Sequence, residues 1–132
     1  MLSGQCNCGA VAYELSAEPW GVFVCHCSIC RRATGTNGNA VLLIPNEHFR
    51  WKSGLAHITT WTKPGHDWQT WFCKVCGANV PGENDAQRMF IPAGSLDDDR
   101  NLRVLDHIWV DSKASWDEIG DAGQQHAGAF DT

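Results

Sequence analysis

The sequence has no long hydrophobic run, no long basic run and no segment typical of a secretory leader. Its longest apolar run, residues 40–44, is far too short to cross a membrane. Residues 1–4 do not begin the charged, apolar and small-residue series of a signal peptide. The formal net charge is −5, which argues against general nucleic-acid binding because such binding depends on neutralising phosphates. We therefore expect a cytoplasmic protein with no nucleic-acid or membrane partner.

Tyrosine is also scarce, with one residue, whereas tryptophan occurs seven times. Large aromatic side chains in this proportion suggest a packed core or a lined pocket more than a platform for stacking bases. A length of 132 residues, with 43% hydrophobic and 19% charged residues, fits a globular protein with a modest core. We expect a single domain at residues 1–119 and a flexible tail at residues 120–132, which are small and polar.

Short segments with period-two alternation predict a mainly β chain with few short helices. Val11, Tyr13 and Leu15 fall on one face of such a segment. One short helix is expected to end near Gly35, and another to begin at Ser115, where a Ser-x-x-Glu pattern matches a capping box. Further strands are expected at residues 20–24, 40–44, 57–62, 68–72, 89–91 and 104–110.

Seven cysteines are an odd number, which argues against a secreted disulfide framework and favours metal-bound thiolates in a reducing cytosol. Four thiolates suit a closed structural zinc site, and three suit a catalytic zinc site with one open position. Spacing alone does not say which thiols share a metal. The cysteines fall into three groups: Cys6 and Cys8; Cys25, Cys27 and Cys30; Cys73 and Cys76.

The middle group is the most unusual. If the segment enters as a strand, Cys25 and Cys27 point to the same face, and a turn after Ser28 returns Cys30 toward them. Such neighbours make poor disulfide partners but good ligands for a soft divalent metal, most plausibly zinc. The alternative is a second closed site in which a histidine is the fourth ligand. The candidates for that ligand are His26, His57, His66 and His107.

The last pair, Cys73 and Cys76, is followed by Gly77, as in a zinc knuckle whose glycine relieves the bend. The competing interpretation is a redox-active pair. It lacks the βαβ context expected of a thioredoxin-like protein.

Taken in order, these segments resemble the family of glutathione-dependent formaldehyde-activating enzymes, which includes centromere protein V. The order and spacing of the pieces over most of the chain make the combination specific. The pieces are GQCNCG at residues 4–9, CHCSICRR at residues 25–32 with Gly35, FCKVCG at residues 72–77, AGSLDD at residues 93–98, HI at residues 107–108 and KASW at residues 113–116.

The resemblance implies a β-tent fold of antiparallel sheets with zinc knuckles at their edges. It also implies two zinc sites: a structural one held by four cysteines and a catalytic one held by three. The structural ligands are Cys6, Cys8, Cys73 and Cys76, and the catalytic ligands are Cys25, Cys27 and Cys30. The implied activity, classed with carbon–sulfur lyases, is addition of the glutathione thiol to formaldehyde to give S-hydroxymethylglutathione.

The hypothesis is therefore a zinc-dependent addition of a glutathione-like thiol to formaldehyde or a related small aldehyde, or the reverse. His26 and Ser28 lie near enough in sequence to be candidate proton donors, whereas His107 suits a packed strand position. Arg31 and Arg32 either bind the carboxylates of the thiol substrate or are surface charges. The alternative function is a non-catalytic, zinc-stabilised module that binds a thiol or a protein.

Overall fold

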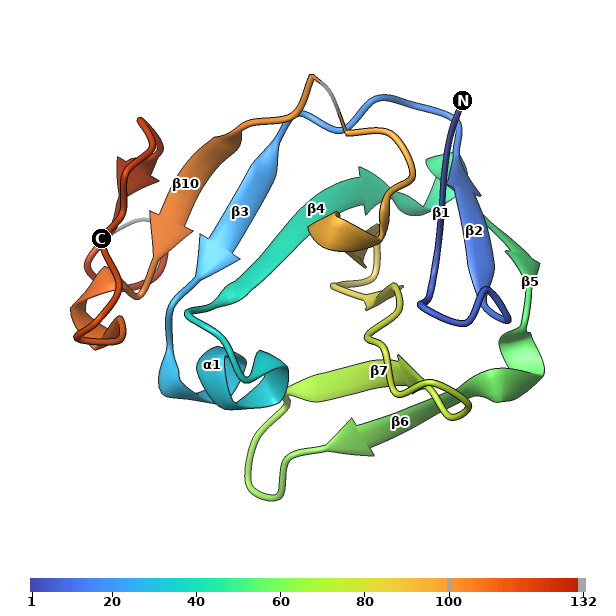
Figure 1. Cartoon of the computed structure of the whole chain (residues 1–132), viewed down its shortest axis with the longest axis horizontal. Coiled ribbons are helices and arrows are strands. Elements are labelled where there is room, and N and C mark those ends of the chain that lie inside the picture. Colours follow the sequence, from blue (N-terminus) through green and yellow to red (C-terminus); the bar gives the residue numbers. More distant parts are fainter. Residues whose placement is uncertain (100, 131–132) are drawn as a thin grey trace. The chain divides into compact units, whose positions relative to one another are not determined.

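β-Strands predominate in the computed structural model, which describes residues 1–99 and 101–130 (Figure 1). The chain forms two compact units: Met1–Pro19 with Leu43–Arg100, and Trp20–Leu42 with Asn101–Thr132. The expectation of a mainly β chain with antiparallel sheets is confirmed.

The first unit contains a three-stranded antiparallel sheet in the order β1-β2-β5. Its strands are β1 (Leu2–Gln5), β2 (Ala12–Leu15) and β5 (Phe49–Ser53). Val11, Tyr13 and Leu15 are each at most 1% exposed, so the alternation in the sequence identified the buried face correctly. The turn between β1 and β2 carries Cys6 and Cys8.

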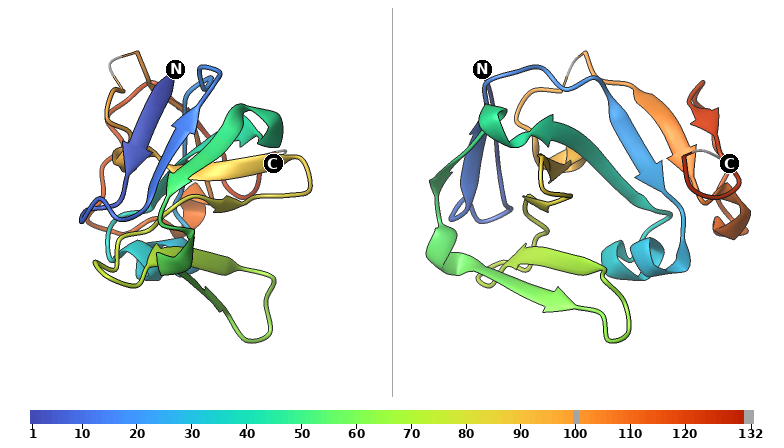
Figure 2. Two further views of the ribbon diagram at one scale, coloured as in Figure 1. Left: turned by 90° about the vertical axis from the view of Figure 1, so that its right-hand side faces the viewer. Right: turned by 180° about the vertical axis from the view of Figure 1, so that it is seen from behind.

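The first unit also contains two antiparallel hairpins. Figure 2 shows the ribbon from two further sides. β6 (Ile58–Thr62) pairs with β7 (Gln69–Cys73), and β8 (Gly82–Glu83) pairs with β9 (Arg88–Pro92). The end of β7 is the start of the Cys73–Cys76 loop. Three short 3-10 helices lie between the strands: η1 (Asn46–His48), η2 (Leu55–His57) and η3 (Ala93–Ser95).

A small hydrophobic cluster in the first unit surrounds its thiols. Cys6, Val11, Cys73 and Val80 are buried together, with Trp51, Trp71, Ile58, Ala10, Cys76 and Ala78 packed against them. Gly54 lies beside this cluster with φ +89°, and a Cβ there would collide with the carbonyl oxygen of Ala10. Glycine is therefore required at this turn by conformation and by space.

The second unit is built on β3 (Val22–Cys25), which lies between β4 and β10. β4 (Asn39–Pro45) begins here, pairs antiparallel with β3 and continues into the first unit. β10 (Val104–Ile108) pairs in parallel with β3 and also with β11 (Gln124–Gln125). These two parallel pairs bring the C-terminal part of the chain beside the segment that carries Cys25.

The α-helix α1 (Ser28–Thr34) directly follows β3. Cys27 is its N-cap and accepts a hydrogen bond from the backbone N–H of Cys30 at 3.4 Å. Gly35, with φ +69°, ends the helix by donating its N–H to the Arg31 carbonyl. The predicted end is confirmed, and the helix begins at Ser28, where a cysteine thiol, and not a hydroxyl or carboxylate, caps it.

The predicted helix beginning at Ser115 is wrong. That segment is a turn in which the backbone N–H of Asp117 bonds to the Ala114 carbonyl at 3.1 Å. The Asp117 side chain is buried and accepts a hydrogen bond from Asn37 at 3.3 Å. These contacts fix the chain in a bend where a helix would have to continue. Just before it lies the 3-10 helix η4 (Val110–Ser112).

The segment expected to be a flexible tail is bonded to β10 and the residues after it. Besides the β10–β11 pairing, the N–H of His126 donates to the His107 carbonyl at 2.8 Å, and the N–H of Trp109 donates to the Gly128 carbonyl at 2.8 Å. Its last two residues, 131–132, lie outside the described part. The flexibility of residues 120–132 and the single-domain boundary at residue 119 stay predictions.

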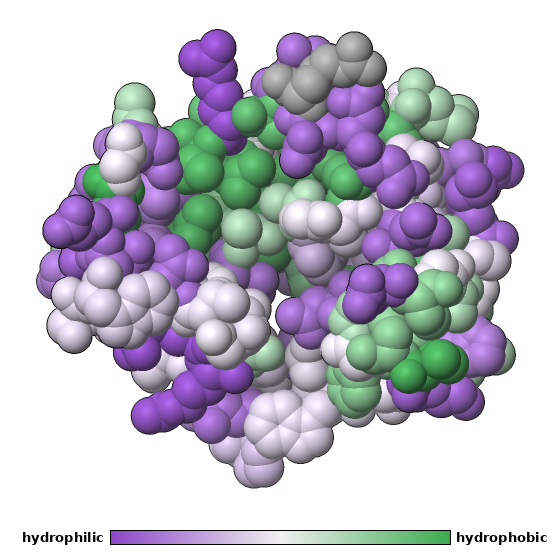
Figure 3. Space-filling model, in the orientation of Figure 1, coloured by the Kyte–Doolittle hydropathy of each residue, from purple (hydrophilic) through white to green (hydrophobic). Residues whose placement is uncertain are grey.

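Four of the seven tryptophans lie outside the packed core, which is one of the two places expected for them. Trp20, Trp61, Trp109 and Trp116 are 85%, 51%, 44% and 69% exposed, whereas Trp51 and Trp71 pack against the buried cluster. On the face drawn in Figure 3, hydrophobic residues lie among hydrophilic ones. Within the part of the chain that the structure describes, every helix is too short or too polar to span a bilayer.

Candidate metal centres

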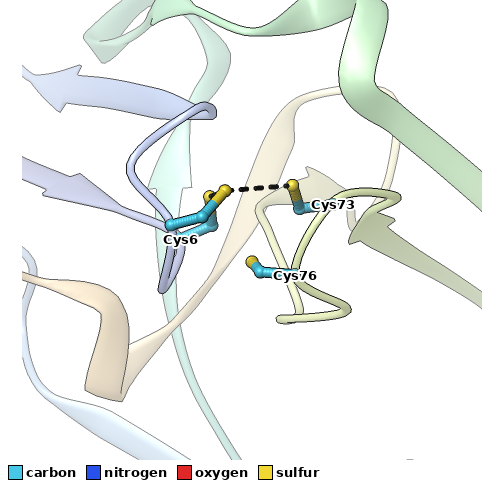
Figure 4. A group of neighbouring side chains, drawn as sticks. Cys6, Cys73 and Cys76 are labelled. Carbon is cyan, nitrogen blue, oxygen red and sulfur yellow. Dashed lines mark hydrogen bonds between the residues drawn. The ribbon is translucent and has the colours of Figure 1, made fainter.

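Four cysteine thiols converge within the first unit. Cys6 and Cys8 come from the turn between β1 and β2, and Cys73 and Cys76 from the end of β7 and the loop after it. Figure 4 shows Cys6, Cys73 and Cys76 pointing toward one another. All four sulfur atoms lie within 4.8 Å of one another. The structure thus brings together the four residues that the family resemblance pairs.

Local backbone hydrogen bonds fold each of these loops around its thiols. In the N-terminal loop the backbone N–H of Val11 points at the Cys6 sulfur at 3.3 Å. In the second loop the N–H of Gly77 donates to the Cys73 carbonyl at 2.7 Å, and Gly77 has φ +77°. N–H groups aimed at sulfur stabilise the thiolate, which is the form that binds metal.

The sulfur spacing of this group tests whether zinc fits. Four sulfurs at about 2.3 Å from a tetrahedral zinc lie about 3.8 Å from each other. The Cys6–Cys8 sulfur distance is 3.7 Å and the Cys8–Cys73 distance is 3.8 Å. The backbone N–H of Ala78 is the main cause that lowers the pKa of Cys76 to about 6. Size and chemistry of the donor set therefore both fit a tetrahedral zinc.

Three further thiols converge within the second unit. Cys25 ends β3, Cys27 caps α1 and Cys30 lies in the first turn of that helix. Their sulfur atoms also lie within 4.8 Å of one another. The predicted return of Cys30 is achieved by the helix, because an N-cap and the residue three positions later lie close together. Cys30 is buried and the other two are half-buried.

The pKa values of Cys25 and Cys30 shift in opposite directions. The hydrogen bond from Cys30 is the main cause that lowers the pKa of Cys25 to about 6. The same hydrogen bond, with burial, raises the pKa of Cys30. Of these two sulfurs, Cys25 is therefore the one that loses its proton more readily. A thiolate with two more thiols beside it is a donor set for a soft divalent metal such as zinc.

Two buried imidazoles, with a carboxylate beside each, adjoin this second cluster. His26 Nε2 lies 2.8 Å from His107 Nδ1, and His107 Nε2 lies 2.9 Å from an oxygen of Asp121. His26 Nδ1 lies 3.5 Å from Asp117 Oδ2. Burial and then the neighbouring His107 lower the pKa of His26, and the hydrogen bond from His107 lowers the pKa of Asp121.

Asp117 and Asp121 are not predicted as site residues from the sequence. Neither belongs to a local pattern of metal or catalytic residues, and both depend on contacts across many residues of sequence. His107 lies in β10 and is 4% exposed, as expected of a histidine packed within a strand. Its ring nevertheless has a specific partner on each side, which strand periodicity does not reveal.

In the described residues, 1–99 and 101–130, both clusters of possible metal ligands consist of cysteine sulfurs without a histidine nitrogen. The alternative of a closed site with a histidine ligand therefore gains no support. The ring of His26, a candidate proton donor, is engaged with His107, and Ser28 opens α1. Arg31 Nε donates to the His26 carbonyl at 3.3 Å, and Arg32 is exposed.

Comparisons with known proteins bear on the family and the fold of this chain. The sequence model of the family described as glutathione-dependent formaldehyde-activating enzyme matches residues 1–112. A Halomonas elongata protein named "Putative glutathione-dependent formaldehyde-activating enzyme" is 28% identical over an aligned length of 131 residues. The match covers 90% of this chain and 81% of that protein. A crystal structure of a Rhodobacter sphaeroides protein has the same fold, with a TM-score of 0.58 at 23% identity, over 72% of this chain and 87% of that one.

Proposed function

Since the chain belongs to the family of glutathione-dependent formaldehyde-activating enzymes, we propose that it adds a glutathione-like thiol to formaldehyde or a related small aldehyde, or catalyses the reverse. In this proposal it is a zinc-dependent enzyme of the carbon–sulfur lyase class. Its seven cysteines are all free thiols, which supports a reducing compartment, and we propose the cytoplasm.

The observation that carries the proposal is the difference between the two thiol clusters. The first has four sulfurs, the full ligand set of a structural zinc, whereas the second has three. Three protein ligands leave one position of a tetrahedral metal for a substrate. We therefore assign Cys6, Cys8, Cys73 and Cys76 to a structural zinc, and Cys25, Cys27 and Cys30 to a catalytic one.

The reaction balances without a redox partner. A bond forms between the thiol sulfur and the aldehyde carbon, and the thiol proton ends on the aldehyde oxygen; the reverse breaks the same bond. When bound at the three-thiol cluster, zinc supplies a Lewis acid that lowers the pKa of a fourth thiol. Cys25 contributes a sulfur that loses its proton readily, because the hydrogen bond from Cys30 lowers its pKa to about 6.

Two arginines on α1 are the proposed contacts for the carboxylates of the thiol substrate. Arg32 is exposed, so its guanidinium is accessible for a bidentate contact with a carboxylate. Arg31 is half-buried and its Nε is bonded to the His26 carbonyl. The Nε of Arg31 therefore has a structural role. In this proposal the terminal nitrogens of its guanidinium contact the substrate carboxylate.

The test is to incubate the zinc-loaded protein with formaldehyde and a panel of thiols, and to follow adduct formation by NMR. We expect faster adduct formation with at least one carboxylate-bearing thiol, and loss of that acceleration in Cys27→Ser. The circular dichroism of the variant should be unchanged, because Cys27 is half-buried and lies outside the four-thiol cluster. Thiol binding without acceleration would replace the proposal with the alternative, a non-catalytic binding module.

A further inference from the structure

A hydrogen-bonded chain joins the C-terminal segment to the residue between the first two thiols of the three-thiol cluster. It runs from Asp121 to His107 at 2.9 Å and from His107 to His26 at 2.8 Å. His26 and His107 are 1% and 4% exposed, while Asp121 is 41% exposed. The chain therefore begins at the surface and ends in the interior, directly beside Cys25 and Cys27.

The bond at the carboxylate end has one possible direction. A carboxylate only accepts, so His107 Nε2 donates a hydrogen bond to Asp121. The other ring nitrogen, His107 Nδ1, lies 2.8 Å from His26 Nε2, so one hydrogen bond joins the two rings. Asp121 thus orients the ring of His107 and, through the bond between the rings, that of His26. A second contact supports the same carboxylate, because the backbone N–H of Gly123 donates to Asp121 Oδ1 at 2.8 Å.

His26 is held by its backbone as well as by its ring. Its N–H donates to the Ile108 carbonyl at 3.0 Å, and its carbonyl accepts from Arg31 Nε at 3.3 Å. Because side chains alternate along an extended segment, the His26 ring lies on the face opposite to the Cys25 side chain. Contacts that hold the His26 ring on that opposite face therefore also fix the directions in which the Cys25 and Cys27 thiols point.

Asp121 lies beyond the part of the chain that matches the family, which ends at residue 112. The described C-terminal segment also reaches β10 through a second pair, in which His126 Nε2 lies 2.9 Å from Asp106 Oδ1. The hydrogen bond of that second pair involves neither the His26 ring nor the His107 ring. It therefore provides a way to loosen the segment without removing the carboxylate from His107.

We propose that Asp121 is a positioning residue for the three-thiol cluster, acting through His107 and His26 to hold Cys25 and Cys27 in a metal-binding arrangement. The inference rests on the proposed function only in that the cluster binds a metal. Outer partners of metal sites typically contribute about 10-fold to 100-fold to metal affinity. We expect an effect of that size on the three-thiol cluster and none on the four-thiol cluster.

The experiment uses the full chain loaded with cadmium-113, whose NMR spectrum should give one line for each cluster. Asp121→Ala and Asp121→Asn should shift or broaden the line of the three-thiol cluster and lower its cadmium affinity about 10-fold to 100-fold in a chelator competition. The line of the four-thiol cluster should stay unchanged and so reports that the variant is folded. Asp121→Glu, which keeps the carboxylate, should recover part of the affinity.

Two controls separate the carboxylate from general loosening of the segment. Glu118→Gln removes an exposed carboxylate nearby and should match the wild type. His126→Phe breaks the second pair and should leave the three-thiol line closer to wild type than Asp121→Ala does. Equal effects of His126→Phe and Asp121→Ala, or no effect of Asp121→Ala, would overturn the inference.

The same spectra separate this inference from the proposed function. A wild-type protein with a single cadmium line would overturn both, because the three-thiol cluster would then not bind metal. If the wild type gives two cadmium lines and neither of them changes in Asp121→Ala, only the inference is overturned. Two lines with the expected response, in a protein that fails to accelerate thiol addition, would uphold the inference and remove the proposed function.

Discussion

Replacing a ligand of the four-thiol cluster should destabilise the protein by an amount that depends on how deeply the ligand is buried. Cys8 is exposed, whereas Cys73 is fully buried at 0% exposed. Serine at either position removes a strong zinc ligand. Only at position 73 does it also place a hydroxyl in the hydrophobic cluster with Val11 and Val80.

The two contributions have different sizes. Zinc at about 1,000 times its Kd stabilises the folded state by about 4 kcal/mol. A buried hydroxyl without a partner costs about 1–3 kcal/mol more. For 132 residues the unfolding entropy makes each kcal/mol worth about 3.6 °C in Tm. Cys8→Ser should therefore lower Tm by about 15 °C in zinc, and Cys73→Ser by about 4–11 °C more.

The assay is thermal unfolding followed by circular dichroism, in excess zinc and again after metal removal by a chelator. Without metal, Cys8→Ser and wild type should melt together, while Cys73→Ser should remain about 4–11 °C lower. If Cys8→Ser melts with the wild type in excess zinc, the four thiols do not hold a metal. If the two variants melt together without metal, the argument from burial is refuted.

Three further predictions concern other parts of the chain. Arg32→Gln should raise KM for glutathione several-fold while leaving KM for 2-mercaptoethanol, which has no carboxylate, unchanged in steady-state kinetics; equal effects on both thiols would rule out a carboxylate contact. Gly54→Ala should cost about 1–3 kcal/mol in urea unfolding, because φ is +89° and the Cβ would meet the Ala10 carbonyl; an unchanged urea midpoint would contradict this. Burial raises the pKa of Tyr13 from 10.0 to about 12. The protonated phenol therefore contributes about 2–3 kcal/mol to the free energy of unfolding below pH 10, and this contribution is lost as pH rises toward 12. Tyr13→Phe should flatten the fall in urea midpoint across that range, and an equally steep fall in the variant would refute the role of Tyr13.

Local patterns predicted the strands and the thiol loops because each depends on a few neighbouring residues. The alternation of Val11, Tyr13 and Leu15 identified a buried face, since strand side chains repeat with period two. The family resemblance supplied the pairing of the Cys6–Cys8 loop with the Cys73–Cys76 loop. Spacing alone does not contain that pairing, because it depends on how strands far apart in sequence meet.

What the sequence did not reveal depends on long-range pairing. The parallel alignment of β3 with β10 brings His107 to His26, and no periodicity within either strand predicts that register. The capping-box pattern at Ser115 predicted a helix because it considers only local hydrogen bonds. In the structure the Asp117 carboxylate is fixed by Asn37, a tertiary contact that overrides the local preference.

Native mass spectrometry of the zinc-loaded protein, with and without glutathione, tests the central claim most directly. The account predicts two zinc ions in the wild type and one in Cys27→Ser, because the four-thiol cluster is unaffected by that change. Glutathione should add only to the species with two zinc ions. Two zinc ions in Cys27→Ser, or glutathione bound equally to the species with one, would contradict the assignment of Cys25, Cys27 and Cys30 to an open metal site.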